Sequence, residues 1–158
     1  MLTKSRFAAT LVATLVFFTG IAVFIWQLSG SKLPNYPRVE ATIANEKFTL
    51  LAPQTTKERQ RGLSAVAKLP SGYGMLFPGH KYIRIWMKDM KYPIDIVWID
   101  KDGKVIHIVD NARPSSYPKT TFVNPENTAA KYAIELNSGE AKRLGLGSTS
   151  TIDMALSK

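Results

Sequence analysis

The stretch Arg84–Val105, RIWMKDMKYPIDIVWIDKDGKV, decides the fold because it holds two strand patterns with a corner between them. In the first pattern, Ile83–Lys88, apolar and polar side chains alternate as they do on the two faces of a strand. The second pattern, Ile94–Ile99, is apolar on both faces except at Asp95, which is typical of a strand in the middle of a sheet. Lys101–Lys104 predicts a tight turn, after which the chain returns to pair with the second strand.

Short strand patterns continue on both sides of this stretch, and two short helices interrupt them. A capping box at Thr55–Glu58 predicts the start of the first helix, which we expect to end at Gly62. Gly139–Leu144 predicts the second helix. The predicted strands are Val39–Ile43, Lys47–Leu51, Gly74–Phe77, Val105–Val109, Lys131–Leu136 and Ser148–Leu156. The first two are expected to form a hairpin with a two-residue turn at Asn45-Glu46. This order predicts a mainly β fold, a sandwich or a barrel.

A long loop is predicted at Asp110–Asn127, where three prolines stand among serines, threonines and asparagines. Long ordered loops on small domains often carry binding residues. We therefore expect this loop to form part of a binding surface.

The N-terminal segment Phe7–Leu28, FAATLVATLVFFTGIAVFIWQL, has no charged residue and predicts a single transmembrane helix. Roughly twenty apolar residues are enough to cross the hydrocarbon core of a bilayer. A cleaved signal peptide is the alternative, with Lys4 and Arg6 as its basic region. Such peptides have an apolar core of about 7–15 residues and an A-x-A-like cleavage site. The apolar stretch here is longer and the site at Leu28–Gly30 is poor, so we favour a retained signal anchor.

The charges around this segment predict its orientation. Two basic residues precede it and only Lys32 follows closely, so the positive-inside rule places residues 1–6 in the cytoplasm. Residues 29–37 then form a linker, and residues 38–158 form an extracytoplasmic domain, either periplasmic or on the cell surface.

The chain carries a formal net charge of +9 at pH 7. Without Lys4, Arg6 and Lys32, 18 basic residues remain against 12 acidic ones, so the outer part carries about +6, which favours anionic partners such as envelope polymers or lipid headgroups. Its basic residues are scattered, with no basic run and no interleaved basic and aromatic positions, so nucleic acid is not an expected partner. The expected partners are the membrane, through the N-terminal helix, and an anionic envelope ligand or a protein.

Several kinds of site are excluded by residues that the chain lacks. It has no cysteine, which rules out disulfides, thiolate metal sites and a cysteine nucleophile. Its two histidines, His80 and His107, are too few and too far apart for the usual zinc ligand sets. No nucleophile-elbow, Walker or dinucleotide-binding motif is present. We therefore expect neither a metal nor an organic cofactor.

Asp95 is the anomalous residue of the central strand, since a buried carboxylate among apolar neighbours needs a partner. Arg61 and Arg84 are candidate partners. The favoured interpretation is an ion pair, or an acceptor for backbone N–H groups, that fixes the strand corner. The alternative is a catalytic acid, paired with Glu135 at the separation of about 5–10 Å that glycoside hydrolases use.

Trp86 stands between Arg84 and Lys88 on the more polar face of its strand. An exposed indole flanked by basic side chains is suited to stacking on a sugar or to binding an anion. The predicted binding residues are Arg61, Arg84, Trp86, Lys88 and Tyr117, the last from the long loop.

Several blocks along the chain resemble one known family. They are Arg61-Gly62-Leu63, Gly74–Phe77, Trp86-Met87-Lys88, Pro93–Ile96 with Ile99-Asp100, and Tyr132–Asn137 with Gly139. In their order and spacing the chain resembles the uncharacterised bacterial and archaeal family called Domain of Unknown Function 192, over Val39–Ile152. The resemblance implies a compact jelly-roll-like β structure, an N-terminal export signal or anchor, and no established activity. The chain departs from the family at Ser64, where the family has methionine, and at Asp89, where it has asparagine.

These observations predict a membrane-anchored extracytoplasmic β domain, a jelly-roll-like sandwich or barrel with one or two short helices. Its expected function is the non-catalytic binding of an envelope component or a protein partner. The alternative function is that of a hydrolase-like enzyme, which would act on envelope polysaccharide through Asp95 and Glu135.

Overall fold

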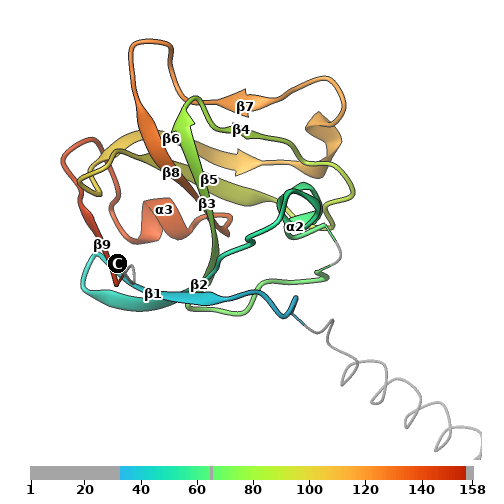
Figure 1. Ribbon diagram of the computed structural model, residues 1–158, viewed down its shortest axis with the longest axis horizontal. Coiled ribbons are helices and arrows are strands. Elements are labelled where there is room, and N and C mark those ends of the chain that lie inside the picture. The colour runs from blue at the N-terminus through green and yellow to red at the C-terminus, as the bar shows by residue number, and fades with distance from the viewer. Residues whose placement is uncertain (1–32, 65, 156–158) are drawn as a thin grey trace, which may run out of the picture. The chain divides into compact units, whose positions relative to one another are not determined.

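The computed structural model describes residues 33–64 and 66–155, and most of the regular structure in this part of the chain consists of short strands (Figure 1). The strands are β1 (Arg38–Ile43), β2 (Glu46–Leu51), β3 (Tyr73–Lys81), β4 (Arg84–Ile85), β5 (Ile94–Ile99), β6 (Val105–Ala112), β7 (Phe122–Val123), β8 (Ala130–Asn137) and β9 (Ile152–Met154). The helices are α2 (Thr56–Arg61), α3 (Glu140–Arg143) and the 3-10 helix η1 (Pro114–Ser116). The predicted mainly β domain with short helices is confirmed.

The predictions for the N-terminus concern residues outside this description. Residues 1–32, which contain the predicted transmembrane helix 7–28, are not among the described residues. None of the helices that the structure describes is long and apolar enough to span a membrane. Inside the predicted linker 29–37, Tyr36 is buried and packs against the core of the domain.

Seven of the described strands form one mixed sheet in the order β6-β5-β8-β3-β2-β1-β9, and β4 pairs with β7 in a separate two-stranded sheet. Neighbouring strands are antiparallel except β2 and β3, which run parallel. Parallel neighbours need a crossover connection, which usually contains a helix. Here the crossover from β2 to β3 carries α2 (Figure 1).

The two edges of the large sheet meet at one end. Lys104, just before β6, forms an isolated bridge with Thr151, just before β9. Beside this bridge the Val105 N–H donates a hydrogen bond to the Ser150 carbonyl at 2.9 Å. The seven strands of the large sheet therefore curve so that its two edge strands, β6 and β9, are joined at this bridge, and the sheet is otherwise open. The expected sandwich of two large sheets is not formed.

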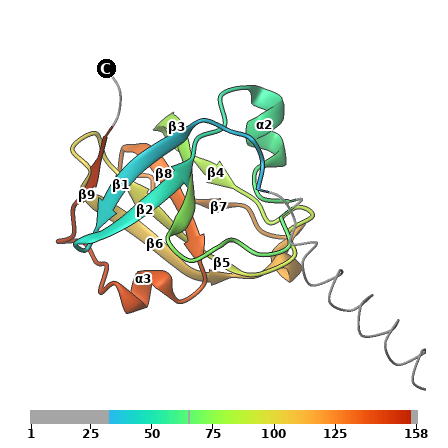
Figure 2. The ribbon, with the colours of Figure 1, turned by 90° about the horizontal axis from the view of Figure 1, so that it is seen from below.

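Both faces of the large sheet are buried. One core, on the side of α2 and β4, contains Leu63 and Trp98, and the other, on the side of α3, contains Val97 and Ile134. Figure 2 shows α2 and α3 on different sides of the sheet. Because β5 lies between the two cores, all six of its residues are buried. The prediction of a central strand at Ile94–Ile99 is confirmed.

The first hairpin has a two-residue turn, as predicted, but the turn is shifted by one residue. Ile43 pairs with Glu46, so the turn consists of Ala44 and Asn45. Both residues have a positive φ, 48° and 67°, as a type I′ turn requires. The predicted Asn45-Glu46 turn is wrong because it would place a glutamate in the left-handed region, which asparagine adopts more readily.

Helix α2 begins at the predicted capping box. The Glu58 N–H donates to the Thr55 hydroxyl at 3.2 Å, and the Thr55 N–H donates to the Glu58 carboxylate at 2.9 Å. Gly62 follows the helix with a φ of 48°, a conformation that favours glycine. Arg59 and Arg61 consequently lie in the last helical turn.

The strand predicted at Ile83–Lys88 is shorter than expected. Only Arg84 and Ile85 pair with another strand, and their partners, Val123 and Phe122, come from the predicted long loop. The predicted alternation is nevertheless confirmed, because the odd-numbered residues of this segment are buried and the even-numbered residues are exposed.

Candidate functional site

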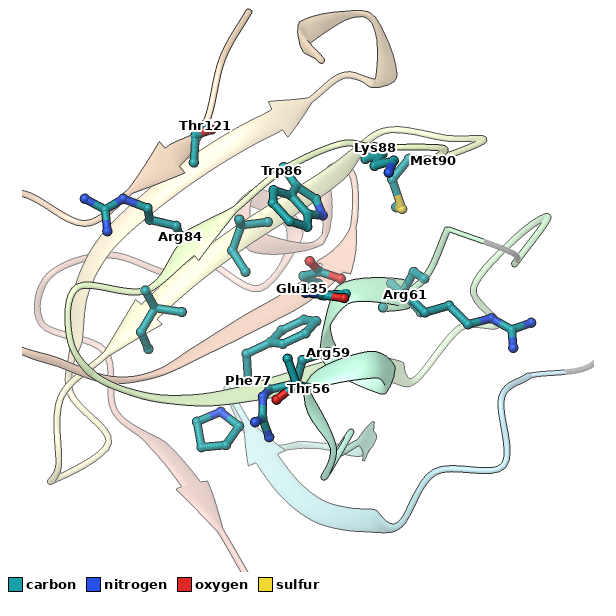
Figure 3. Close-up of a pocket in the computed structure, with 16 residues that line it drawn as sticks. Thr56, Arg59, Arg61, Phe77, Arg84, Trp86, Lys88, Met90, Thr121 and Glu135 are labelled. Carbon is teal, nitrogen blue, oxygen red and sulfur yellow. The ribbon is translucent and has the colours of Figure 1, made fainter. Parts of the chain in front are cut away.

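A cavity of about 340 Å³ lies between α2 and the segment that runs from β4 to Met90 (Figure 3). Phe77 of β3 and Glu135 of β8 also line it, so the large sheet forms its floor. Four of the five predicted binding residues line this cavity, namely Arg61, Arg84, Trp86 and Lys88. The fold thus brings together residues that are far apart in the sequence.

The walls of the cavity are largely apolar and aromatic. Leu63, Ile85 and Met90 contribute aliphatic surface. Figure 3 shows the carboxyl of Glu135 between the rings of Trp86 and Phe77. Concave sites that combine apolar walls with a few polar groups are typical of small-molecule binding.

Glu135 is the only acidic residue among those that line the cavity. It pairs with Met75 of β3 and with Ile96 of β5, in the middle of the sheet. The residue is only 5% exposed, and its Oε2 atom has no hydrogen-bond partner among the described residues. Burial raises the pKa of Glu135 to about 8. The carboxyl is therefore mainly protonated at neutral pH, with hydrogen-bonding capacity that no described residue fills.

Tyr92 is a second enclosed polar group near Glu135, and the sequence analysis missed it. Its hydroxyl also has no hydrogen-bond partner among the described residues. Burial raises the pKa of the Tyr92 phenol, and the charge of Glu135 raises it further, so the two groups lie within electrostatic range of each other. Nothing in the local sequence around Tyr92 indicates that its hydroxyl is enclosed, because this enclosure arises only in the folded domain.

Basic side chains surround the cavity. Arg59 and Arg61 come from the last turn of α2, Arg84 from β4, and Lys88 from the segment after it. None of the four forms an ion pair with a described residue. Figure 3 shows the guanidinium groups of Arg61 and Arg84 pointing to opposite sides, away from Glu135. They give the cavity positive surroundings without supplying a counter-ion for its carboxyl.

Asp95 does not belong to this cavity. It is completely buried, and its carboxylate accepts hydrogen bonds from the N–H groups of Asn111 and Ala141, both at 2.9 Å. Arg61 and Arg84 are therefore not its partners, and the sequence-based suggestion of an ion pair with either is wrong. The alternative of a carboxylate that accepts backbone hydrogen bonds is confirmed.

The alternative of a catalytic pair formed by Asp95 and Glu135 is also wrong. Across the two strands, Asp95 pairs with Leu136, whereas Glu135 pairs with Ile96. Successive side chains of a strand point to opposite faces of the sheet. Glu135 therefore faces the cavity while Asp95 faces the core on the α3 side, and one substrate cannot contact both. This geometry excludes the hydrolase that depended on the pair.

The long loop contributes to the site through a different residue from the one predicted. Tyr117 follows η1 and is 41% exposed, but it does not line the cavity. Thr121 lines the cavity instead, one position before β7. Of the predicted loop, only Thr121 lines the cavity, and β7, which follows it, pairs with β4.

Asn124 connects this loop to the segment that precedes β4, and the sequence analysis missed it. Its side-chain carbonyl accepts a hydrogen bond from the Ile83 N–H at 3.1 Å. Its amide group donates to the Lys81 carbonyl at 2.8 Å and to the Thr128 hydroxyl at 3.0 Å. An asparagine before a proline is typical of an exposed turn, so only the fold reveals that this side chain is buried.

Comparisons with known proteins agree with this fold. The family model for Domain of Unknown Function 192, described as Uncharacterized ACR, matches residues 39–154. The chain belongs to this family. The resemblance found in the sequence is thereby confirmed. No curated protein matches the chain.

Two solved structures resemble this member of Domain of Unknown Function 192. One is a protein from Sinorhizobium meliloti 1021 whose description as a transcription regulator is provisional. It is 26% identical to this chain with a TM-score of 0.67, and the match covers 78% of this chain and 98% of that one. The other, a protein of unknown function from Novosphingobium aromaticivorans, is 23% identical with a TM-score of 0.62, and the match covers 78% of this chain and 94% of that one. These similarities support the fold and assign no activity to the cavity.

Proposed function

We propose that this protein is a binding domain without catalytic activity, and that the cavity beside Trp86 holds a small organic ligand. The observation that carries the proposal is the buried Glu135 carboxyl, which lines the cavity without a hydrogen-bond partner among the described residues. Buried polar groups in folded proteins are nearly always hydrogen-bonded, so each exception needs an explanation. A ligand atom would supply the partner that Glu135 lacks.

The size and lining of the cavity favour a small molecule over a protein partner. A volume of about 340 Å³ is near the lower end of the range for small-molecule sites. Glu135 is only 5% exposed, so a flat protein surface would not reach it. The rings of Phe77 and Trp86 favour a ligand that has an apolar or aromatic part.

The proposed location of the domain is outside the cytoplasm, tethered to the membrane by residues 7–28. In that location the ligand would be a component of the cell envelope. The basic side chains of Arg61, Arg84 and Lys88 favour a ligand that also carries a negative charge.

Three molecules that share a phenyl ring test the proposal: benzoate, benzamide and benzylamine. Each is titrated into the isotope-labelled full-length protein and followed by NMR through the backbone amide signals of Gly62 and Leu63, which line the cavity. At least one of the three is expected to shift these signals saturably. If none of them does so, the proposal is wrong.

A pair of variants shows whether the cavity is the site. Trp86→Ala is expected to weaken binding at least about fivefold, because contact with an aromatic ring contributes roughly 1 kcal/mol beyond the buried area. Tyr117→Ala is the matched control, since Tyr117 and Trp86 are similarly exposed, 41% and 45%, but only Trp86 lines the cavity. An equal loss of affinity in both variants would argue against the cavity.

A further inference from the structure

We propose that the cavity selects ligands that carry a carboxylate, and that Glu135 recognises this group as a neutral acid that donates a hydrogen bond to it. This inference rests on the proposed function and specifies the class of ligand. It follows from the position of Glu135, from the charges around it and from the hydrogen-bonding capacity that the protein leaves unfilled.

The position of Glu135 makes its protonated form the favoured one. Its neighbours across the sheet are Met75 and Ile96, neither of which can donate a hydrogen bond to a carboxylate. A buried carboxylate needs such donors, whereas a protonated carboxyl needs an acceptor for its own O–H. Oε2 has neither kind of partner among the described residues. An acceptor oxygen on the ligand would complete the site.

The charges around the cavity argue against a cationic ligand, which would be the other natural partner of a glutamate. Four basic residues line the cavity and Glu135 is the only acidic one. An ammonium group would have to enter this positive environment and would force the buried carboxyl to ionise. A carboxylate is attracted by the same environment and needs no change in the charge of Glu135.

The titratable groups that line the cavity with Glu135, or lie within electrostatic range of it, come from each element packed around it. Arg59 and Arg61 belong to α2, Arg84 to β4, Lys88 to the segment after β4, and Tyr92 to the segment before β5. Burial raises the pKa of Glu135 to about 8. A ligand carboxylate beside it would raise this pKa further, because two carboxyl groups in one site share a proton. Binding should therefore need the proton on Glu135 and weaken above pH 8.

Among oxyanions, a carboxylate fits this site better than a phosphate. A carboxylate carries one negative charge, and one proton can be shared between it and the Glu135 carboxyl. A phosphate monoester carries close to two charges at neutral pH, and burying it beside an acid costs more free energy. Phenyl phosphate therefore serves as a fourth molecule in the test.

The decisive experiment measures the affinity of the full-length protein for the four molecules at pH 6 and pH 9.5 by isothermal titration calorimetry, because backbone amide protons exchange with water too fast for NMR at the higher pH. Benzoate is expected to bind most tightly at pH 6 and about thirtyfold more weakly at pH 9.5, as follows from a pKa of about 8 for Glu135. Benzoate is ionised at both pH values, and lysine and arginine side chains remain largely charged at both. Comparison with Glu135→Gln, whose amide does not titrate, assigns the pH dependence to Glu135.

Substitutions at Glu135 separate donation of a hydrogen bond from charge. Glu135→Gln is expected to bind benzoate at both pH values with little change in affinity between them, because an amide N–H donates at any pH. Glu135→Leu is expected to lose at least tenfold in benzoate affinity at pH 6. Unchanged dispersion of the amide signals outside the cavity checks that both variants are folded.

Three outcomes would overturn the inference and leave the proposed function intact. The first is that benzylamine or phenyl phosphate binds at least as tightly as benzoate at pH 6. The second is a benzoate affinity that does not depend on pH. The third is loss of benzoate binding in Glu135→Gln. Failure of benzoate, benzamide and benzylamine to bind saturably would instead remove the proposed function itself.

Discussion

Asp95 and Ala141 are joined by a hydrogen bond of 2.9 Å, in which the backbone N–H at the start of α3 donates to the carboxylate at the second position of β5. The same carboxylate accepts the Asn111 N–H of β6 at 2.9 Å. One buried side chain thus connects the central strand to an outer strand and to the helix that covers this face. Its role is architectural, and it lies on the face of the sheet opposite the cavity.

Replacing Asp95 is expected to destabilise the domain without removing a site residue. Asp95→Ala leaves two backbone N–H groups without their acceptor, at a cost of about 1–3 kcal/mol for each one that remains buried. The free energy of unfolding, measured by urea denaturation, should fall by about 2–5 kcal/mol in total. The exposed acid Asp153 provides the control, and Asp153→Ala should remain close to wild type. Similar stabilities for the two variants would contradict the role assigned to Asp95.

Asn124 is expected to support the cavity indirectly. Asn124→Ala removes hydrogen bonds to the Ile83 N–H and the Lys81 carbonyl, which hold the segment leading to Trp86. We expect a loss of about 1–3 kcal/mol in the free energy of unfolding and weaker binding of benzoate. Asn127→Ala, in the same loop but at an exposed position, is the matched control. Faster hydrogen exchange of the Ile83 N–H in Asn124→Ala, but not in Asn127→Ala, would show that the loss of stability comes from this segment.

Glu135 is expected to make the stability of the domain depend on pH. The pKa of its carboxyl is about 8 in the folded state, and its ordinary value, taken for the unfolded state, is 4.5. Between these pH values the unfolded state has lost the proton and the folded state keeps it. The free energy of unfolding should therefore decrease as pH rises from about 4.5 to 8, by up to about 1.4 kcal/mol per pH unit from this group, and should not change further above pH 8.

The variant Glu135→Gln tests this linkage, because an amide does not titrate. Urea denaturation at pH 4.5, 6 and 8 should show the variant gaining stability relative to wild type as the pH increases. Glu126→Gln, at an exposed position, is the control and should show no such trend. A constant difference between Glu135→Gln and wild type at all three pH values would show that the carboxyl titrates alike in both states.

Gly74 allows β2, β3 and β8 to approach each other beside the site. A Cβ atom at this position would lie 2.6 Å from Leu50 Cδ2 and 2.9 Å from the Glu135 carbonyl oxygen. Gly74→Ala is therefore expected to cost about 1–3 kcal/mol of unfolding free energy through overpacking. Gly147→Ala has open space for its methyl group and serves as the control in the same thermal denaturation experiment.

The parts of the fold that the sequence predicted depend on neighbours within a few residues. The bounds of Ile94–Ile99 follow from a run that is apolar except at Asp95, and the start of α2 follows from the reciprocal hydrogen bonds of Thr55 and Glu58. The predicted hairpin turn was displaced by one residue from the observed one, because the position of a turn depends on which single residues, such as Ala44, adopt a positive φ. The cavity could not be assembled in this way, since it needs the crossover between β2 and β3.

The candidate site shows the same division. The exposed Trp86 could be recognised from the alternation in its own strand, and four of the five proposed binding residues do line the cavity. The pairing of Asp95 with Glu135 failed because it needed the register of β5 against β8, and a shift of one position exchanges the two faces. The enclosed hydroxyl of Tyr92 and the buried amide of Asn124 depend on contacts between distant segments.

The bridge between Lys104 and Thr151 has a consequence for self-association. Free edges of a sheet expose backbone groups that can recruit a strand from another molecule and begin a polymer. Here β9 covers the outer side of β1, and the bridge holds the start of β9 against the start of β6. A chain cut before β9 would uncover β1 along Ala41–Ile43 and would be prone to form fibrils.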